Sequence, residues 1–94
     1  MMNYLHTKGP WFVDDSCGEL RIIAGDLMIA RVAQHHGGVG KANAHLIAAG
    51  PELLEMLEIA VARIELANAE SDPILSAWLP DARAVITKAE GRLA

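Results

Sequence analysis

The sequence is poor in cysteine, aromatic residues and basic charge, and it has no long apolar run. Because Cys17 is its one cysteine, the chain cannot form an internal disulfide, which excludes a disulfide-stapled secreted scaffold. Eight Lys and Arg stand against twelve Asp and Glu, so the net charge is −4 and the basic excess that nucleic-acid binding requires is missing. No secretory signal or membrane-spanning run is recognisable. We therefore expect a cytoplasmic protein with no membrane partner and no direct nucleic-acid partner.

Apolar residues make up 52% of the chain and charged residues 21%, which is a globular composition. Ninety-four residues are few for two independent cores, so we expect a single domain over residues 1–94. Residues 1–41 carry equal numbers of acidic and basic residues. Residues 42–94 carry eight acidic and four basic residues, and they also contain 13 of the 16 alanines. Because Ala and Glu favour helices and the earlier β-branched and aromatic residues favour strands, the sequence predicts an α+β fold with the sheet first.

Three strands are expected between about residues 11 and 33. A cluster of turn-forming residues separates the first two strands, and its Asp14 and Asp15 carboxylates are expected to bond their own backbone. The expected strands are Trp11–Val13, Glu19–Ala24 and Leu27–Ala33. They form a three-stranded antiparallel meander, which is too small to be stable alone and needs a helix layer or a partner chain.

The turn between the second and third strands sets their register. Gly25-Asp26 suits a two-residue hairpin turn. Counted outward from this turn, the expected partners are Ala24 with Leu27, Ile22 with Ile29, and Leu20 with Arg31. This register places two sets of side chains on opposite faces of the sheet, namely Leu20, Ile22, Ile29 and Arg31 on one and Arg21, Ile23, Met28 and Ala30 on the other.

The helical half, about residues 42–90, has clear start and stop signals. A short helix over about 42–49 is followed by a second helix that begins at Pro51. Asp72-Pro73 predicts the start of a third helix, with Asp72 as its N-cap, and a kink or restart is expected at Pro80. Apolar residues recur at helical spacing in both long helices. The sequence therefore predicts a helical hairpin packed on the meander.

Two segments resemble a family of short phage and prophage proteins. They cover about 20 of the 94 residues, and they are His6-Thr7-Lys8-Gly9-Pro10-Trp11 and Ala42-Asn43-Ala44-His45-Leu46-Ile47-Ala48-Ala49-Gly50-Pro51-Glu52-Leu53-Leu54. In that family Arg is more frequent at the position of His45 and Ala at that of Gly50. The resemblance implies a phage origin, and so the cytoplasm of the host cell. Small acidic phage proteins often act against host defence, by sequestering a signalling nucleotide or by capping a host protein.

A glycine-rich segment, His35–Lys41, connects the last strand to the first helix and is the strongest candidate for a binding site. Glycines let backbone N–H groups converge on an anion, and a helix N-terminus adds positive potential. The segment is not a Walker A motif, because His35 and Ala42 occupy the positions of a required Gly and Ser or Thr. The alternative is a plain strand-to-helix connection. The residues expected to contact a ligand are Arg31, His36, Gly38, Gly40, Lys41 and Asn43.

No pattern in the chain predicts catalysis or a metal site. The histidines and Cys17 lack the spacing of a zinc site, and no nucleophile lies beside a base. We therefore expect no enzymatic activity, no cofactor and no metal. Trp11 and Trp78 are expected to be structural, as a core residue and a core or interface residue. Asn43 has a second interpretation, as a buried side chain that caps the helix or ties it to the sheet.

Three functions remain open from the sequence. The first is a non-catalytic binding protein that sequesters a small phosphorylated or nucleotide ligand of host defence signalling. The alternative is an anti-defence inhibitor, similar to anti-CRISPR proteins, that docks its acidic helical half on a basic, nucleic-acid-binding host protein. A structural accessory protein without a ligand is the third. Because the apolar stripes are wide for one small sheet to cover, we also expect a symmetric homo-oligomer with helix-on-helix contacts.

Overall fold

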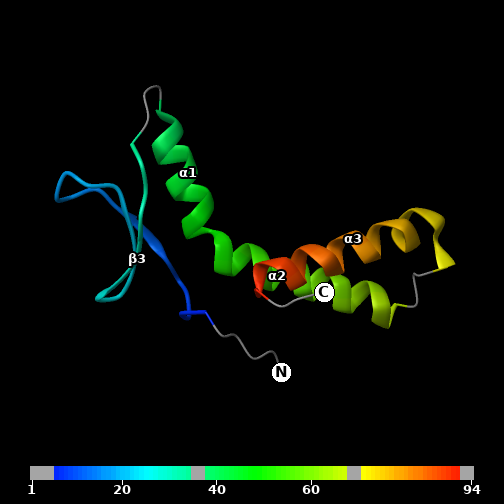
Figure 1. Ribbon diagram of the computed structural model, residues 1–94. Coiled ribbons are helices and arrows are strands. Elements are labelled where there is room, and N and C mark those ends of the chain that lie inside the picture. Colours follow the sequence, from blue (N-terminus) through cyan, green and yellow to red (C-terminus); the bar gives the residue numbers. More distant parts are fainter. Residues whose placement is uncertain (1–5, 35–37, 68–70, 92–94) are drawn as a thin grey trace. The chain divides into compact units, whose positions relative to one another are not determined.

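The fold is described from a computed structural model, which describes residues 6–34, 38–67 and 71–91. In chain order the elements are β1 (Phe12–Asp14), β2 (Arg21–Ala24), β3 (Leu27–Arg31), α1 (Val39–Ala48), α2 (Gly50–Leu66) and α3 (Pro73–Ala89) (Figure 1). An antiparallel three-stranded sheet followed by helices confirms the predicted α+β fold. The residues group into two compact units, a sheet unit over Thr7–Glu52 and a hairpin unit built on Leu53–Ala94. That residues 1–94 form a single domain stays a prediction.

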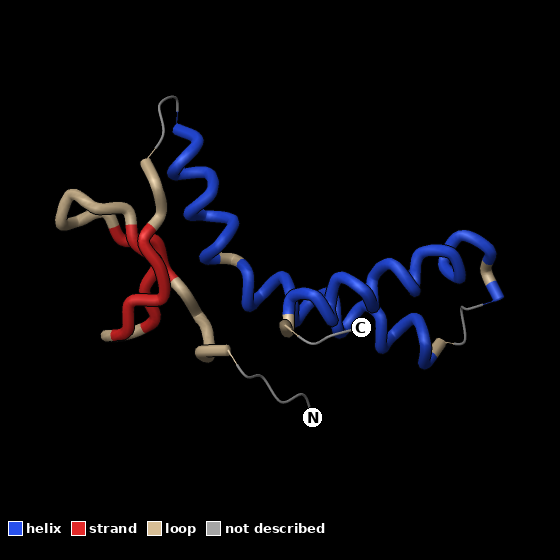
Figure 2. Tube along the Cα trace, in the orientation of Figure 1, coloured by secondary structure: helices blue, strands red, loops and turns tan. Residues whose placement is uncertain are grey.

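The sheet, red in Figure 2, has the strand order β1-β2-β3, and a β-bulge on its last strand changes the predicted register. Between β2 and β3 the partners are Arg21 with Arg31, Ile22 with Ala30, Ile23 with Met28, and Ala24 with Leu27. The pairing at the turn is therefore as predicted, whereas the predicted partners of Ile22 and Leu20 are wrong. Ile29 is an extra residue between two paired ones, and such an insertion moves every later side chain to the opposite face.

The core of the sheet unit lies between α1 and the sheet. Four residues are buried there, namely Leu20, Ile22, Ala44 and Ala48, and Ile22 is completely buried. Because of the bulge, Ala30 and Val32 join this core, and Arg31 lies instead beside Arg21 on the other face. The bulge thus keeps a charged side chain out of the core.

Helix α1 packs on β1 and β2 through a stripe of small residues. Gly40, Ala44 and Ala48 are all buried, and their spacing of four residues places them on one side of the helix. Because none of them carries more than a methyl group, the helix backbone lies close to Leu20 and Ile22. Trp11 packs at the side of the same core, and its indole Nε1 donates a hydrogen bond to the Thr7 carbonyl at 3.1 Å.

Helix α1 begins at Val39, earlier than the predicted start at about Ala42. Gly38 is the N-cap residue with φ +82°, a left-handed conformation that glycine adopts without strain. Helix propensity alone disfavours Gly40 inside a helix, but its burial against the sheet overrides that preference. As a result, Gly40 and Lys41 lie in the first turn of α1 and not in a loop before it.

In the hairpin unit, α2 and α3 lie side by side and the chain reverses direction between them (Figure 2). Their buried contact consists of Val61, Leu79 and Ala82, with Leu57, Ile64 and Ile86 packed around it. The predicted start of α3 is confirmed, since the Asp72 carboxylate accepts hydrogen bonds from the backbone N–H groups of Ile74 at 2.8 Å and Leu75 at 3.3 Å. Of the two outcomes expected at Pro80, the restart is wrong, because α3 is one helix from Pro73 to Ala89, and the kink stays a prediction.

Candidate functional site

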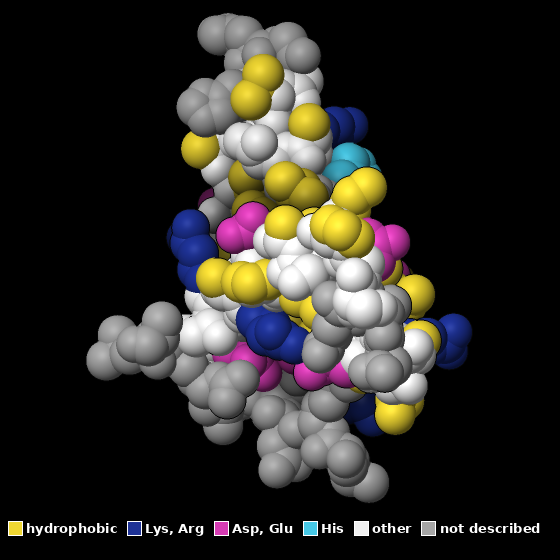
Figure 3. Space-filling model, turned by 90° about the vertical axis from the view of Figure 1, so that its right-hand side faces the viewer, with side chains coloured by type: hydrophobic (Ala, Val, Ile, Leu, Met, Phe, Trp, Pro, Cys, Tyr) yellow, Lys and Arg dark blue, Asp and Glu magenta, His cyan; other side chains and the backbone are white. Residues whose placement is uncertain are grey.

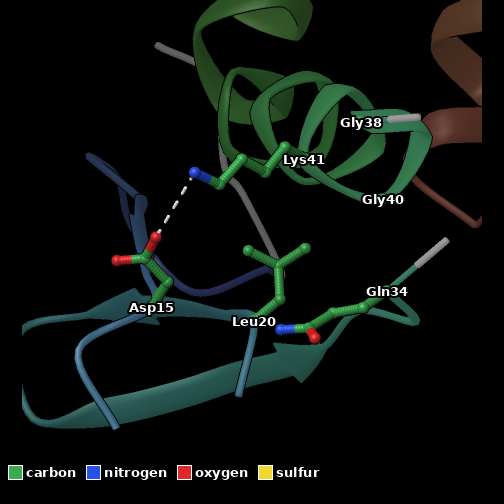
Figure 4. Close-up of a pocket in the computed structure, with 6 residues that line it drawn as sticks. All are labelled: Asp15, Leu20, Gln34, Gly38, Gly40 and Lys41. Atoms are coloured by element: carbon green, nitrogen blue, oxygen red, sulfur yellow. Dashed lines mark ion pairs between the residues drawn. The ribbon is translucent and has the colours of Figure 1, made fainter. Parts of the chain in front are cut away.

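A pocket of about 280 Å³ lies in the sheet unit at the first turn of α1 (Figure 4). Its wall combines residues from the turn after β1, from the two sides of the sheet-to-helix connection, and from α1 itself. The lining residues are Asp15, Leu20, Gln34, Gly38, Gly40 and Lys41. The second half of the glycine-rich segment therefore does border a cavity.

Lys41 and Asp15 face each other across this pocket (Figure 4). The Lys41 Nζ lies 3.6 Å from the Asp15 Oδ2, and the two side chains are 66% and 60% exposed. An ion pair between two such exposed side chains contributes only about 0–1 kcal/mol, because water screens both charges. The Lys41 ammonium group is therefore held over the pocket but is not firmly bound to its partner.

The N-terminus of α1 adds a second source of positive potential. A helix leaves its first backbone N–H groups without acceptors inside the helix, and its dipole places partial positive charge at that end. The N-cap Gly38 offers no side-chain acceptor, and the first turn of α1 contains no acidic residue. This end of the helix is thus not neutralised by its own cap, and it borders the pocket through Gly38 and Gly40.

The wall also contains one apolar side chain, that of Leu20, and one amide side chain, that of Gln34. Leu20 is 3% exposed and belongs to the core of the sheet unit, so it gives the pocket a rigid apolar floor. Gln34 lies near the floor (Figure 4), and its Nε2 donates a hydrogen bond to the Gly18 carbonyl at 3.4 Å. An apolar floor with a few polar groups at the rim is the usual chemistry of a small-molecule site.

Two of the other predicted ligand residues, Arg31 and Asn43, do not line this pocket. The Arg31 Nε lies 3.4 Å from the Glu19 Oε2, and Arg31 does not line the cavity. Asn43 is exposed on α1, so its interpretation as a buried residue is wrong, because the small residues of the helix are the ones that face the sheet. His36 lies outside the described residues, as do its neighbours at positions 35 and 37.

Sequence reasoning missed Asp15, Leu20 and Gln34. The prediction that the turn carboxylates bond their own backbone holds for Asp14, whose Oδ1 accepts from the Ser16 N–H at 3.1 Å and the Ser16 hydroxyl at 2.7 Å. Asp15 instead pairs with Lys41, which lies far away in the sequence. The one available signal was opposite charge, and charge does not identify a partner at that separation.

A second polar cluster lies on the sheet face away from α1. Asp14 is opposite Arg21 in the register, and the two side chains form an ion pair. The pKa of Asp14 is lowered from 3.8 to about 2, chiefly by the hydrogen bonds from Ser16 and in smaller part by Arg21. These contacts hold the turn after β1 in place, and with it the neighbouring Asp15.

Within the described ranges, no three His, Cys, Asp or Glu side chains are grouped so that they could hold a metal ion. The helices of these same ranges include none with the length and apolar character needed to cross a membrane.

Trp78 is 38% exposed on α3, in the hairpin unit.

Comparison with known proteins identifies the family of this chain. Residues 2–93 match the family model described as Salmonella phage P22 protein Y8K6, so the chain belongs to that phage protein family. This agrees with the phage origin that the two sequence segments implied. No curated protein and no solved structure matches the chain.

Proposed function

We propose that this member of the phage P22 protein Y8K6 family is a non-catalytic binding protein that holds a small phosphorylated ligand, such as a nucleotide of host defence signalling, in the pocket at the start of α1. The observation that carries the proposal is the position of Lys41 over a cavity of about 280 Å³ that the positive end of α1 borders. A phosphate group would interact with the first-turn N–H groups and with the ammonium group together.

Asp15 has a defined place in this proposal. In the free protein it pairs weakly with Lys41 at 3.6 Å and compensates that charge. A phosphate carries more negative charge than a carboxylate and offers several acceptor oxygens, so it would displace Asp15 from Lys41. The Leu20 floor would contact an apolar or base part of the ligand.

The proposal of binding without catalysis rests on the chemistry of the lining residues. Asp15 and Lys41 are the charged groups among the described lining residues. They face one another, and both are largely exposed. The described lining residues include no hydroxyl, thiol or imidazole group that a neighbouring base could activate. Their chemistry therefore supports binding rather than catalysis.

Two substitutions at the same ion pair test the function. Lys41→Ala and Asp15→Asn both remove the Lys41–Asp15 contact, so their effects on folding should be small and similar. Their effects on the affinity for an anionic ligand should be opposite. We expect Lys41→Ala to weaken binding roughly 10-fold or more, and Asp15→Asn to strengthen it several-fold, since repulsion is removed. Binding would be measured by calorimetry and thermal shift with nucleoside mono-, di- and triphosphates and cyclic nucleotides.

Arg31→Ala is the matched control. Arg31 is 67% exposed and pairs with Glu19 at 3.4 Å, so it resembles Lys41 in exposure and pairing but lies outside the pocket lining. This variant should bind as the wild type does. Mass spectrometry of the supernatant after denaturation would identify a ligand that copurifies. If no phosphorylated compound binds, or if Lys41→Ala and Asp15→Asn change binding in the same direction, the proposal is wrong.

The alternative function, docking of the acidic helical half on a basic host protein, is favoured by the eight acids and four bases that follow residue 41. Two of these acids already serve the fold, because Asp72 caps α3 and Glu65 pairs with Arg83. We therefore rank this function second. Copurification of a basic host protein that is released by high salt would favour it over the ligand site.

A further inference from the structure

The hairpin unit exposes more large apolar side chains than it buries. Its buried contact between α2 and α3 consists of three residues, Val61, Leu79 and Ala82. Large apolar side chains that stay exposed in the same unit are Leu53, Met56, Leu66, Ile74, Trp78 and Val85. Hydrophobic groups also reach the surface among charged ones in the view of Figure 3. So small a core leaves much of the apolar surface of the two helices uncovered.

Most of these exposed residues lie on a single face of the hairpin. At 100° per residue, Leu53 and Met56 lie about a quarter turn from the buried stripe of α2. Ile74, Trp78 and Val85 lie about a quarter turn from the buried stripe of α3, in the same rotational sense. Because the two helices run in opposite directions, equal rotations bring both stripes to the same side. We call these five residues the hairpin apolar face.

The charged residues of the hairpin provide an independent check on this geometry. Glu65 and Arg83 are rotated from the buried stripes in the opposite sense, so the same reasoning places both on the other side of the hairpin. They do meet there, since the Arg83 Nη2 lies 3.0 Å from the Glu65 Oε2. The hairpin thus has one apolar face and one face that carries an ion pair.

We propose that the hairpin apolar face binds the same face of a second copy of this chain, forming an antiparallel four-helix bundle around a twofold axis. The exposed fractions of the five side chains run from 38% to 79%. Because an aromatic side chain offers about 150–250 Å² and an aliphatic one somewhat less, the face presents on the order of 500 Å². Two copies would bury up to about 1,000 Å², which is the lower limit for a specific interface.

A second copy fits this face better than an unrelated partner does. A twofold interface uses one patch twice, so an apolar face of matched helices is complementary to itself. Four antiparallel helices around an apolar core are also the common arrangement into which such hairpins assemble. The four helices would then share one core, made of the two hairpin cores and the two apolar faces between them.

The test is the mass of the protein in solution, measured by sedimentation velocity from about 1 to 100 µM. The wild type should be a dimer, or a higher oligomer built on it. Ile74→Glu with Val85→Glu places charges in the interface and should raise the dissociation constant roughly 100-fold or more. Both sites are exposed and glutamate is a good helix former, so the monomer should keep its helical circular dichroism.

Leu66→Glu is the matched control, because Leu66 is 86% exposed at the end of α2 and points away from the hairpin apolar face. This variant should keep the wild-type mass. A Trp11→Phe variant leaves Trp78 as the one tryptophan, and its emission should shift to the red on dilution through the dissociation constant. A wild type that is monomeric at 100 µM overturns the proposal, whether the face is covered by the chain's own sheet unit or by another partner. Equal dissociation by Leu66→Glu and by the double variant overturns it as well.

Discussion

Truncation of Ile22 tests whether the sheet unit is held together by the contact between β2 and α1. Ile22 is completely buried, and it lies in one cluster with Leu20, Ala44 and Ala48. Ile22→Ala removes three carbon atoms from that contact. At about 0.8 kcal/mol for each buried carbon, the lost transfer free energy is about 2.5 kcal/mol.

A cavity adds to this loss, because a closely packed helix and sheet relax only in part. Alanine on the α1 side gives the cluster few long side chains that could fill the space. A residual cavity would add roughly 1–2 kcal/mol, so the free energy of unfolding should fall by about 3.5–4.5 kcal/mol. That is most of the stability of a small domain, which is often about 5 kcal/mol. Ile22→Val should lower it by only about 1 kcal/mol.

Urea unfolding followed by tryptophan emission measures this effect in the sheet unit. Trp11 packs on the Ile22 cluster, so a Trp78→Phe background makes the emission report this unit. Ile23→Ala is the matched control, because Ile23 is the next residue of β2, is only partly buried and faces the other side of the sheet. It should lower the stability by about 1 kcal/mol. Equal losses from Ile22→Ala and Ile23→Ala would refute the assignment of the core.

Three further predictions concern single contacts. The pKa of Asp14 is lowered from 3.8 to about 2, so its contribution to stability is complete above pH 3.8 and is lost as the pH falls through about 2. In Asp14→Asn the free energy of unfolding should therefore depend less on pH within that window. Asp72→Ala should lower the stability of the hairpin by about 1 kcal/mol in thermal unfolding followed by circular dichroism, whereas Ser71→Ala should leave it unchanged. Gly38→Ala should lower the stability of the sheet unit by about 1–2 kcal/mol because its φ is +82°, although nothing lies within 4 Å of the added carbon. Gly50→Ala meets equally open space without a positive φ, and a loss as large as that of Gly38→Ala would contradict the conformational explanation.

The element order could be predicted from the sequence because each signal is local. Strand-forming residues, the Gly25-Asp26 turn and the Asp72-Pro73 helix start depend on neighbours a few positions away. The bulge at Ile29 could not be predicted, because the local sequence does not decide which side chains of β3 face the core of the sheet unit. Either register can accommodate the local sequence, which has the charged Arg31 between the small Ala30 and the branched Val32. Only the packing of the whole sheet unit decides which of these side chains face the core.

The candidate site was predictable only in part for the same reason. Glycines before a helix indicated where a pocket could form, and Gly38, Gly40 and Lys41 do line one. The opposite wall comes from Asp15 and Leu20, which reach the pocket through the tertiary packing of the sheet on α1. Because no local pattern encodes that packing, the sequence offered Arg31 and Asn43 in their place.

The glycine and alanine stripe of α1 has a consequence for the width of the pocket. Gly40 belongs both to this stripe and to the pocket wall. The distance between α1 and the strands therefore also sets the width of the pocket. A larger side chain in the stripe, such as the one in Ala44→Val, would increase the distance between α1 and β2. Homologues that differ at these positions should therefore have pockets of different width without any change in the polar groups that line them.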